Sequence, residues 1–120
     1  MENNIDSVLD SIKKLLGIPK EYDAFDTDLI IHINSVFAIL TQIGVGSPKG
    51  FSIKGSSDKW VNFIPEDNHL FESVRTYVYL KVKLLFDPAS LSSAAIASTE
   101  RLISELECRL NVSAETTTPT

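Results

Sequence analysis

Three aspartates that lie close together, Asp23, Asp26 and Asp28, are the first residues of the chain that could do chemistry. Carboxylate oxygens in a loop bind Ca²⁺, and an EF-hand loop places them at alternate positions, with glycine at position six and glutamate at position twelve. Counting from Asp23, position six is Asp28 and position twelve is Asn34. Helix capping and solvation therefore account for these carboxylates better than a metal site, and we predict none.

A glycine-rich segment, with Gly44, Gly46 and Gly50, is the second candidate, because backbone amides of glycine-rich loops can bind phosphate. These glycines follow a predicted helix instead of a strand. They match neither G-x-G-x-x-G nor the P-loop pattern with its lysine. The segment therefore predicts a flexible turn, and no cofactor site.

Nucleophilic catalysis would need a serine or cysteine with a histidine as its base. Neither His32 nor His69 has such a motif around it. His32 falls opposite the apolar stripe of its predicted helix, which indicates a solvated side chain. His69, near Glu66 and Asp67, offers at most an incidental surface metal contact. We predict no active site, and we do not expect an enzyme.

Composition narrows the class of protein. The chain has 120 residues, 43% of them hydrophobic, which suffices for one domain with one modest core. Its net charge of -5 provides no basic excess to neutralise a phosphate backbone, so direct nucleic-acid binding is disfavoured. No apolar run is long enough to cross a bilayer, and the N-terminus lacks signal-peptide features, so we expect a soluble protein made in the cytoplasm.

The single cysteine, Cys108, predicts a small buried or half-buried apolar residue.

Hydrophobic periodicity predicts an all-α fold, a small four-helix domain over residues 1–111. Apolar residues recur every three or four positions, and glycine or proline follows the first two stripes. The expected helices cover residues 4–16, 27–43, 67–86 and 89–110. A Gly/Ser-rich loop or short hairpin, residues 44–58, separates the second helix from the third. Residues 112–120 are polar and predict a flexible C-terminal tail.

One hard stop joins the third and fourth helices, at Phe86, Asp87 and Pro88. Pro88 lacks an amide proton and disfavours the α region for the residue before it, so the third helix must end there. Asp87 could then accept amide protons at the start of the fourth helix, with Pro88 in its first turn. The pattern predicts a helix, a sharp structural corner and a second helix.

Two aromatic residues and two basic residues are candidates for a partner surface. Trp60 and Phe63 precede the third helix, where capping of the core is favoured over anchoring of a partner. Arg75 and Lys83 share one face of the third helix, where a solvated strip is favoured over contact with an acidic neighbouring subunit.

The fourth helix begins with small side chains nearly all round, including Ala94 and Ala95. Such a surface permits close approach of another helix but buries little area per residue. It predicts packing against a helix of the same domain or of a neighbouring subunit, and both remain open. The expected inner face of this helix consists of Leu91, Ala95, Leu102, Leu106 and Leu110.

Several separated pieces, in this order, resemble the head-tail connector, or adaptor, family of long-tailed bacteriophages. The pieces are Ile43-Gly44-Val45-Gly46, Gly50-Phe51-x-Ile53, Trp60-x-x-Phe63, Tyr77-x-Tyr79-Leu80-Lys81-Val82, Leu84-Leu85-Phe86-Asp87-Pro88 and Glu105-Leu106-Glu107-x-Arg109-Leu110-Asn111. The resemblance covers about residues 5 to 111. The chain departs from the family pattern at Ala89, where many relatives have a second proline, and at Cys108, where many have tryptophan.

The resemblance implies a structural virion protein at the head-tail interface, made in the host cytoplasm. Such a protein forms a homo-oligomeric ring of about twelve subunits beneath the portal protein. The ring extends the DNA channel without specific DNA binding and docks the next head-completion or tail connector protein. No membrane is involved. The candidate subunit or partner interface consists of Phe51, Trp60, Phe63, Arg75, Lys83, Ala94, Ala95 and Arg109.

The alternative, from another functional class, is a small intracellular helical module that binds another protein or has a regulatory role. A DNA-reading regulator should carry a basic recognition helix, and none of the predicted helices is strongly basic. A protein-binding module is compatible with the sequence. An enzyme would need polar groups that converge from the 44–58 loop, and residue spacing gives no sign of them.

Overall fold

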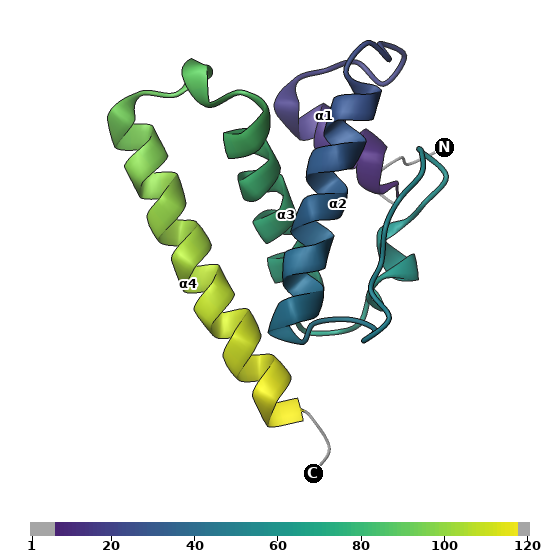
Figure 1. The fold of residues 1–120 in the computed structure, drawn as a ribbon, viewed down its shortest axis with the longest axis vertical. Helices are drawn as coiled ribbons and strands as arrows, with labels where there is room; N and C mark the ends of the chain where they lie inside the picture. The colour runs from purple at the N-terminus through teal and green to yellow at the C-terminus, as the bar shows by residue number, and fades with distance from the viewer. Residues whose placement is uncertain (1–6, 118–120) are drawn as a thin grey trace.

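The computed structural model describes residues 7–117, with side chains through residue 114. In that part of the chain the fold is all-α, as predicted. Its four helices are α1 (Val8–Leu16), α2 (Asp26–Ile43), α3 (Phe71–Phe86) and α4 (Ser93–Thr117), and its two 3₁₀ turns are η2 (Trp60–Asn62) and η3 (Pro88–Ser90). Helix α3 lies between α2 and α4 and makes most of its helix contacts with these two (Figure 1). Its buried residues therefore form the centre of the core.

Helix α1 begins at Val8, where Ser7 is the N-cap and its hydroxyl accepts a hydrogen bond from the amide of Asp10. Residues 4–6, which the periodicity assigned to this helix, lie outside the described residues. Val8, Leu9 and Ile12 are buried, as their spacing predicts. The serine cap satisfies one of the amides that every helix N-terminus leaves without an intrahelical partner.

A lysine is among the most buried residues of α1. The ammonium group of Lys13 donates to the carbonyls of Lys20 and Tyr22 and to the carboxylate of Asp26, at 3.0, 2.7 and 2.8 Å. All three of its protons therefore have acceptors, which is the condition for burying a charge. The network ties the connection between α1 and α2 to the core. Of the three aspartates in the Asp23–Asp28 cluster, Asp26 is the ion-pair partner. No side chain caps α2, so the expectation of helix capping was wrong, whereas Asp23 and Asp28 are exposed, as expected for solvated carboxylates.

The segment 44–58 is a loop, and the described residues contain no strand that would make it a hairpin. The isolated β-bridge found among residues 7–117 joins Ser7 to Lys59, just after this segment. Asn34 of α2 holds the loop: its side chain accepts from the amide of Ile53 at 2.7 Å and donates to the Ile53 carbonyl at 3.1 Å. Ile53 is buried. A side chain thus supplies the pairing that a second strand would have supplied.

The start of α3 was predicted four residues too early. Residues 67–70 form turns, in which the side-chain oxygen of Asn68 accepts from the amide of Leu70 at 2.8 Å. Asparagine favours such local bonds over a continuing helix. Val74, Tyr77 and Val78 are fully buried, as the apolar stripe predicted.

Two expectations about α4 were wrong. Its buried stripe is Ile103, Leu106, Leu110 and Ala114, while Leu102 is 44% exposed. The stripe continues to Ala114, and the helix extends to Thr117, so residues 112–117 are not a tail. The sequence missed this because alanine is a weak apolar signal. Residues 118–120 lie outside the described residues.

Candidate interaction surfaces

The corner at the end of α3 differs in detail from the prediction. Phe86 ends α3, and its ring packs edge-on against Phe25, with ring centroids 5.2 Å apart. Pro88 then starts the 3₁₀ turn η3, and the side chain of Asp87 caps nothing. Ser92 takes that role, because its hydroxyl accepts from the amide of Ala95 at 3.1 Å. The corner is therefore a helix, a 3₁₀ turn and a serine-capped helix.

Trp60 and Phe63 lie in the core, 2% and 8% exposed. The indole nitrogen of Trp60 donates to the hydroxyl of Ser11 at 2.8 Å. Phe63 packs on Phe37 and on the half-buried Phe51, with centroids 4.7 and 5.4 Å apart. These rings fix the loop and η2 against α2, so core capping is the reading the structure supports for Trp60 and Phe63.

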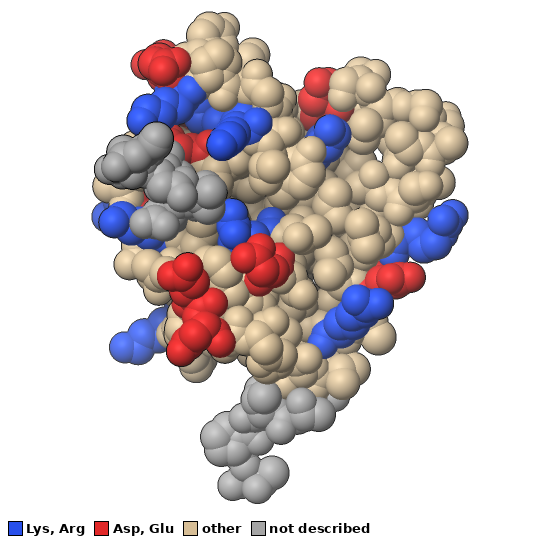
Figure 2. All heavy atoms as spheres, turned by 180° about the vertical axis from the view of Figure 1, so that it is seen from behind, with Lys and Arg blue, Asp and Glu red and all other residues tan. Residues whose placement is uncertain are grey.

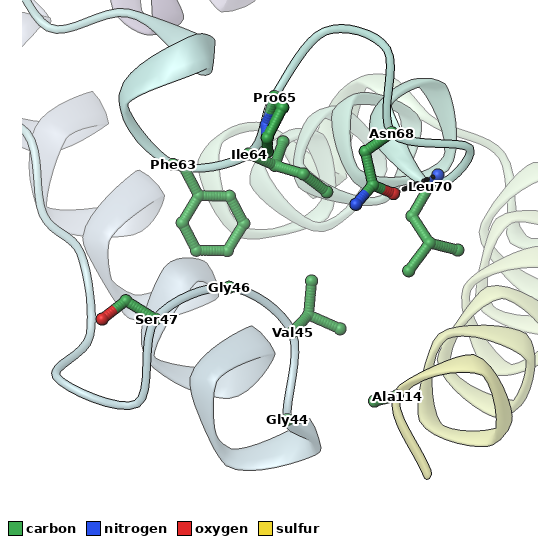
Figure 3. A pocket seen from close by; sticks show the side chains of 10 residues that line it. All are labelled: Gly44, Val45, Gly46, Ser47, Phe63, Ile64, Pro65, Asn68, Leu70 and Ala114. Atoms are coloured by element: carbon green, nitrogen blue, oxygen red, sulfur yellow. Dashed lines mark hydrogen bonds between the residues drawn. The ribbon is translucent and has the colours of Figure 1, made fainter. Parts of the chain in front are cut away.

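A hollow of about 340 Å³ lies at the base of the molecule, between the end of α2, the segment after η2 and the end of α4. Figure 3 shows Gly46 facing the ring of Phe63, with Val45 and Ala114 on the other side of the hollow. A Cβ placed on Gly46 would lie 2.5 Å from a carbon of that ring. Glycine is required here for close approach as well as for its positive φ of 83°.

Arg75 lies near the start of α3, among aromatic rings. Its guanidinium lies 5.9 Å from the ring of Trp60 and 5.5 Å from that of Phe71. One terminal nitrogen bonds both carboxylate oxygens of Glu72, at 3.2 and 3.3 Å. Its Nε is buried and has no hydrogen-bond partner among the described residues. A buried donor of this kind costs free energy unless an acceptor reaches it.

The other predicted interface residues do not form one surface with Arg75. Lys83 is half-buried, and its ammonium lies 5.7 Å from the ring centroid of Tyr79. Ala94 is exposed and Ala95 half-buried on the first turn of α4. Arg109 is exposed and pairs with Glu105 one turn earlier on α4, at 3.7 Å. The candidates therefore divide between core, α3 and α4.

The burial of His32 and Cys108 differs from what the sequence predicts. His32 is half-buried in a shallow hollow with Phe25, Asp28, Phe86 and Asp87, so it is not fully solvated. Cys108 is exposed, which contradicts the expectation of a buried or half-buried residue. The reason is the stripe shift in α4, since residue 108 is off the face that holds Leu106 and Leu110.

A polar contact between α3 and α4 was also not predicted from the sequence. The hydroxyl of Tyr77, a fully buried residue of α3, donates to Oε2 of Glu107 on α4 at 2.7 Å. Burial, then the hydrogen bond and the negative charge of Glu107, raise the pKa of Tyr77 well above its ordinary value. The tyrosine therefore stays a neutral donor at any physiological pH.

In the described part of the chain, no three His, Cys, Asp or Glu side chains gather in a way that could hold a metal ion. No described helix has the length and apolar content needed to span a membrane.

Comparison with known proteins gives one match. A family model described as Phage connector protein matches residues 8–117, which is most of the chain. No curated protein matches, and no solved structure matches. The family match confirms the resemblance that the ordered sequence pieces predicted.

Proposed function

Since the chain belongs to the phage connector protein family, we propose that it is a head-tail connector whose subunits form a ring beneath the portal of the filled capsid. The family supports a structural role in the virion. The proposed ring extends the DNA channel and docks the next connector or tail protein. The observation that carries the proposal is the family match over residues 8–117, which includes all four helices.

The fold is compatible with a structural role. The described hollows are shallow and contain no arrangement of nucleophile, base and oxyanion donors of the kind that an enzyme needs. Buried polar groups such as Lys13 and Tyr77 hold helices and loops together. Their contacts rigidify the protomer, and a rigid protomer is what a ring of fixed diameter needs.

The net charge of -5 favours a channel that lets DNA pass. A ring of about a dozen protomers would carry about -60, so a lumen that shares this charge would repel the phosphate backbone instead of binding it. The portal would act as the template for assembly, because many weak contacts reinforce one another once the first subunits are bound.

Electron microscopy of the purified chain mixed with its portal tests the proposal. We expect a ring coaxial with the portal. A portal prepared without this chain is the control, and added density should appear only in the mixture. A chain that does not associate with the portal contradicts the proposal and favours a small helical protein-binding module. A neutral or basic lumen would contradict the channel argument alone.

A further inference from the structure

A pocket of about 220 Å³ lies beside α3, and we name it the Arg75 pocket. It is lined by residues of α1, η2 and α3, namely Ser11, Leu15, Trp60, Glu72, Arg75, Thr76 and Tyr79. Its rim includes Leu15, which is 55% exposed although leucine favours burial. The pocket thus combines an aromatic floor, an exposed aliphatic rim and one cation.

One donor in the pocket lacks an acceptor. The buried Nε of Arg75 has no partner in the described chain, and the guanidinium stacks over Trp60 and Phe71, which fixes its position. Glu72, its ion-pair partner, has a side chain that is 79% exposed, so that pair is open to water and to other charges. The Nε itself is buried, but the Arg75 side chain is 23% exposed, so a carboxylate from another molecule could reach the outer part of the guanidinium. A fixed, partly desolvated arginine suits such a partner.

Helix α4 carries a stripe with the complementary chemistry. Besides its buried stripe it exposes a second one, spaced by three and four residues, which we name the α4 outer stripe: Leu102, Glu105, Arg109 and Val112. Leu102 and Val112 are 44% and 51% exposed, and they flank the Glu105–Arg109 pair. Figure 2 shows acidic and basic side chains following one another along the edge that α4 forms. The stripe offers an aliphatic side chain, a carboxylate and a cation in that order.

We propose that the Arg75 pocket of one copy receives the α4 outer stripe of a second copy of this chain. Leu102 packs against Leu15, Glu105 accepts from Arg75, and Arg109 pairs with Glu72. Each intrahelical ion pair then exchanges partners with the other, so charge is matched on both sides of the contact.

The two surfaces lie on different parts of one molecule, so the contact is heterologous, as a closed ring requires. The inference rests on the proposed function in this respect, because it identifies the subunit contact of the proposed ring. An isologous contact would place the same surface on both copies and would stop at a dimer.

Charge exchange tests the pairing in the full-length chain. Glu105→Arg, on the surface of α4, should weaken self-association by about tenfold or more, because it places like charges together. Arg75→Glu should do the same, and the double variant should recover most of the loss. Glu100→Arg makes the same change of charge at an exposed glutamate on another face of α4, and it is the matched control. Sedimentation velocity gives the association constant, and circular dichroism checks folding. Glu105→Arg without effect, or a double variant no better than either single one, overturns the inference.

Disulfide cross-linking gives an independent test. Leu15→Cys with Leu102→Cys, in a chain that also carries Cys108→Ser, should give a ladder of products beyond the dimer under mild oxidation. Leu15→Cys with the native Cys108 is the control, because residue 108 lies off the stripe. No product, or product that stops at the dimer, overturns the contact. A coaxial ring on the portal without the ladder overturns only this inference, whereas the ladder without a portal ring overturns only the proposed function.

Discussion

The hydroxyl of Tyr77 donates a 2.7 Å hydrogen bond to the carboxylate of Glu107 and so joins the buried face of α3 to α4. Helix α4 packs mainly on α3, and four of its side chains through residue 114 are buried. This part-buried, charge-assisted bond therefore helps to fix α4 in register. The position of α4 in turn sets where its outer stripe faces.

Replacing Tyr77 with phenylalanine removes this bond and keeps the ring. We expect the free energy of unfolding to fall by about 1–2 kcal/mol, because the half-buried Glu107 loses its donor. Urea unfolding measures the change. Tyr79→Phe is the control, since the hydroxyl of Tyr79 only accepts from Lys83 at 3.3 Å, and it should change stability by less than about 0.5 kcal/mol. Equal effects would show that the Glu107 bond has no special role.

Alkaline pH should lower the free energy of unfolding through Tyr77. The pKa of Tyr77 is raised in the folded state, so its contribution to stability is complete below the unfolded-state pKa of about 10. Above that pH the unfolded tyrosine ionises and the folded one does not, so stability falls by up to about 1.4 kcal/mol per pH unit. The difference between the wild type and Tyr77→Phe should therefore shrink as the pH rises from about 9 to 11. A constant difference in urea unfolding over that range would contradict the assignment.

Lys13→Met should destabilise the fold by about 2–3 kcal/mol, because two carbonyls and the carboxylate of Asp26 lose their donor. Lys14→Met is the matched control: Lys14 is its exposed neighbour, and its loss should cost less than about 0.5 kcal/mol. Thermal unfolding followed by circular dichroism compares the two. A tolerated Lys13→Met would mean that water replaces the ammonium.

Two glycines with nearly the same positive φ separate the cost of backbone strain from the cost of crowding. Gly17 and Gly46 have φ values of 84° and 83°, but a Cβ meets nothing within 4 Å at Gly17 and lies 2.5 Å from the Phe63 ring at Gly46. Gly17→Ala should cost about 1 kcal/mol from the left-handed backbone alone. Gly46→Ala should cost about 1–3 kcal/mol more, because Phe63 must move. Chemical denaturation measures the loss of unfolding free energy in both variants. Equal losses would show that the ring of Phe63 moves aside without cost.

Pro88→Ala tests the corner. Pro88 is exposed and starts a 3₁₀ turn, so its replacement should lower the stability of the protomer by less than about 1 kcal/mol. If the corner sets the angle of α4 for the proposed ring, assembly on the portal should fall much more. Pro48→Ala, in the exposed loop after α2, is the control. Assembly that is unchanged, measured by counting ring-bearing portals in micrographs, would leave the corner with a local role only.

The amino-acid sequence by itself determined where helices form and where most of them end. Apolar residues at three- and four-residue spacing predicted α1, α2 and α3, and Gly17, Gly44 and Pro88 predicted their C-terminal limits to within a residue. These signals are local, because helix periodicity, positive φ and the missing proline amide act within a few residues of chain. The ordered family pieces are also local, and they predicted the connector family.

The tertiary structure alone decided which polar residues are buried and which face of α4 points inward. Lys13 reads as a surface lysine until Lys20, Tyr22 and Asp26 surround its ammonium. Asn34 reads as a helix-surface residue until Ile53, nineteen positions away, pairs with it. In α4, Leu102 and Ile103 are equal candidates by hydrophobicity, and packing on α3 buried Ile103. In each case the cost of burial depends on partners that are distant in sequence, and only the folded chain brings them together.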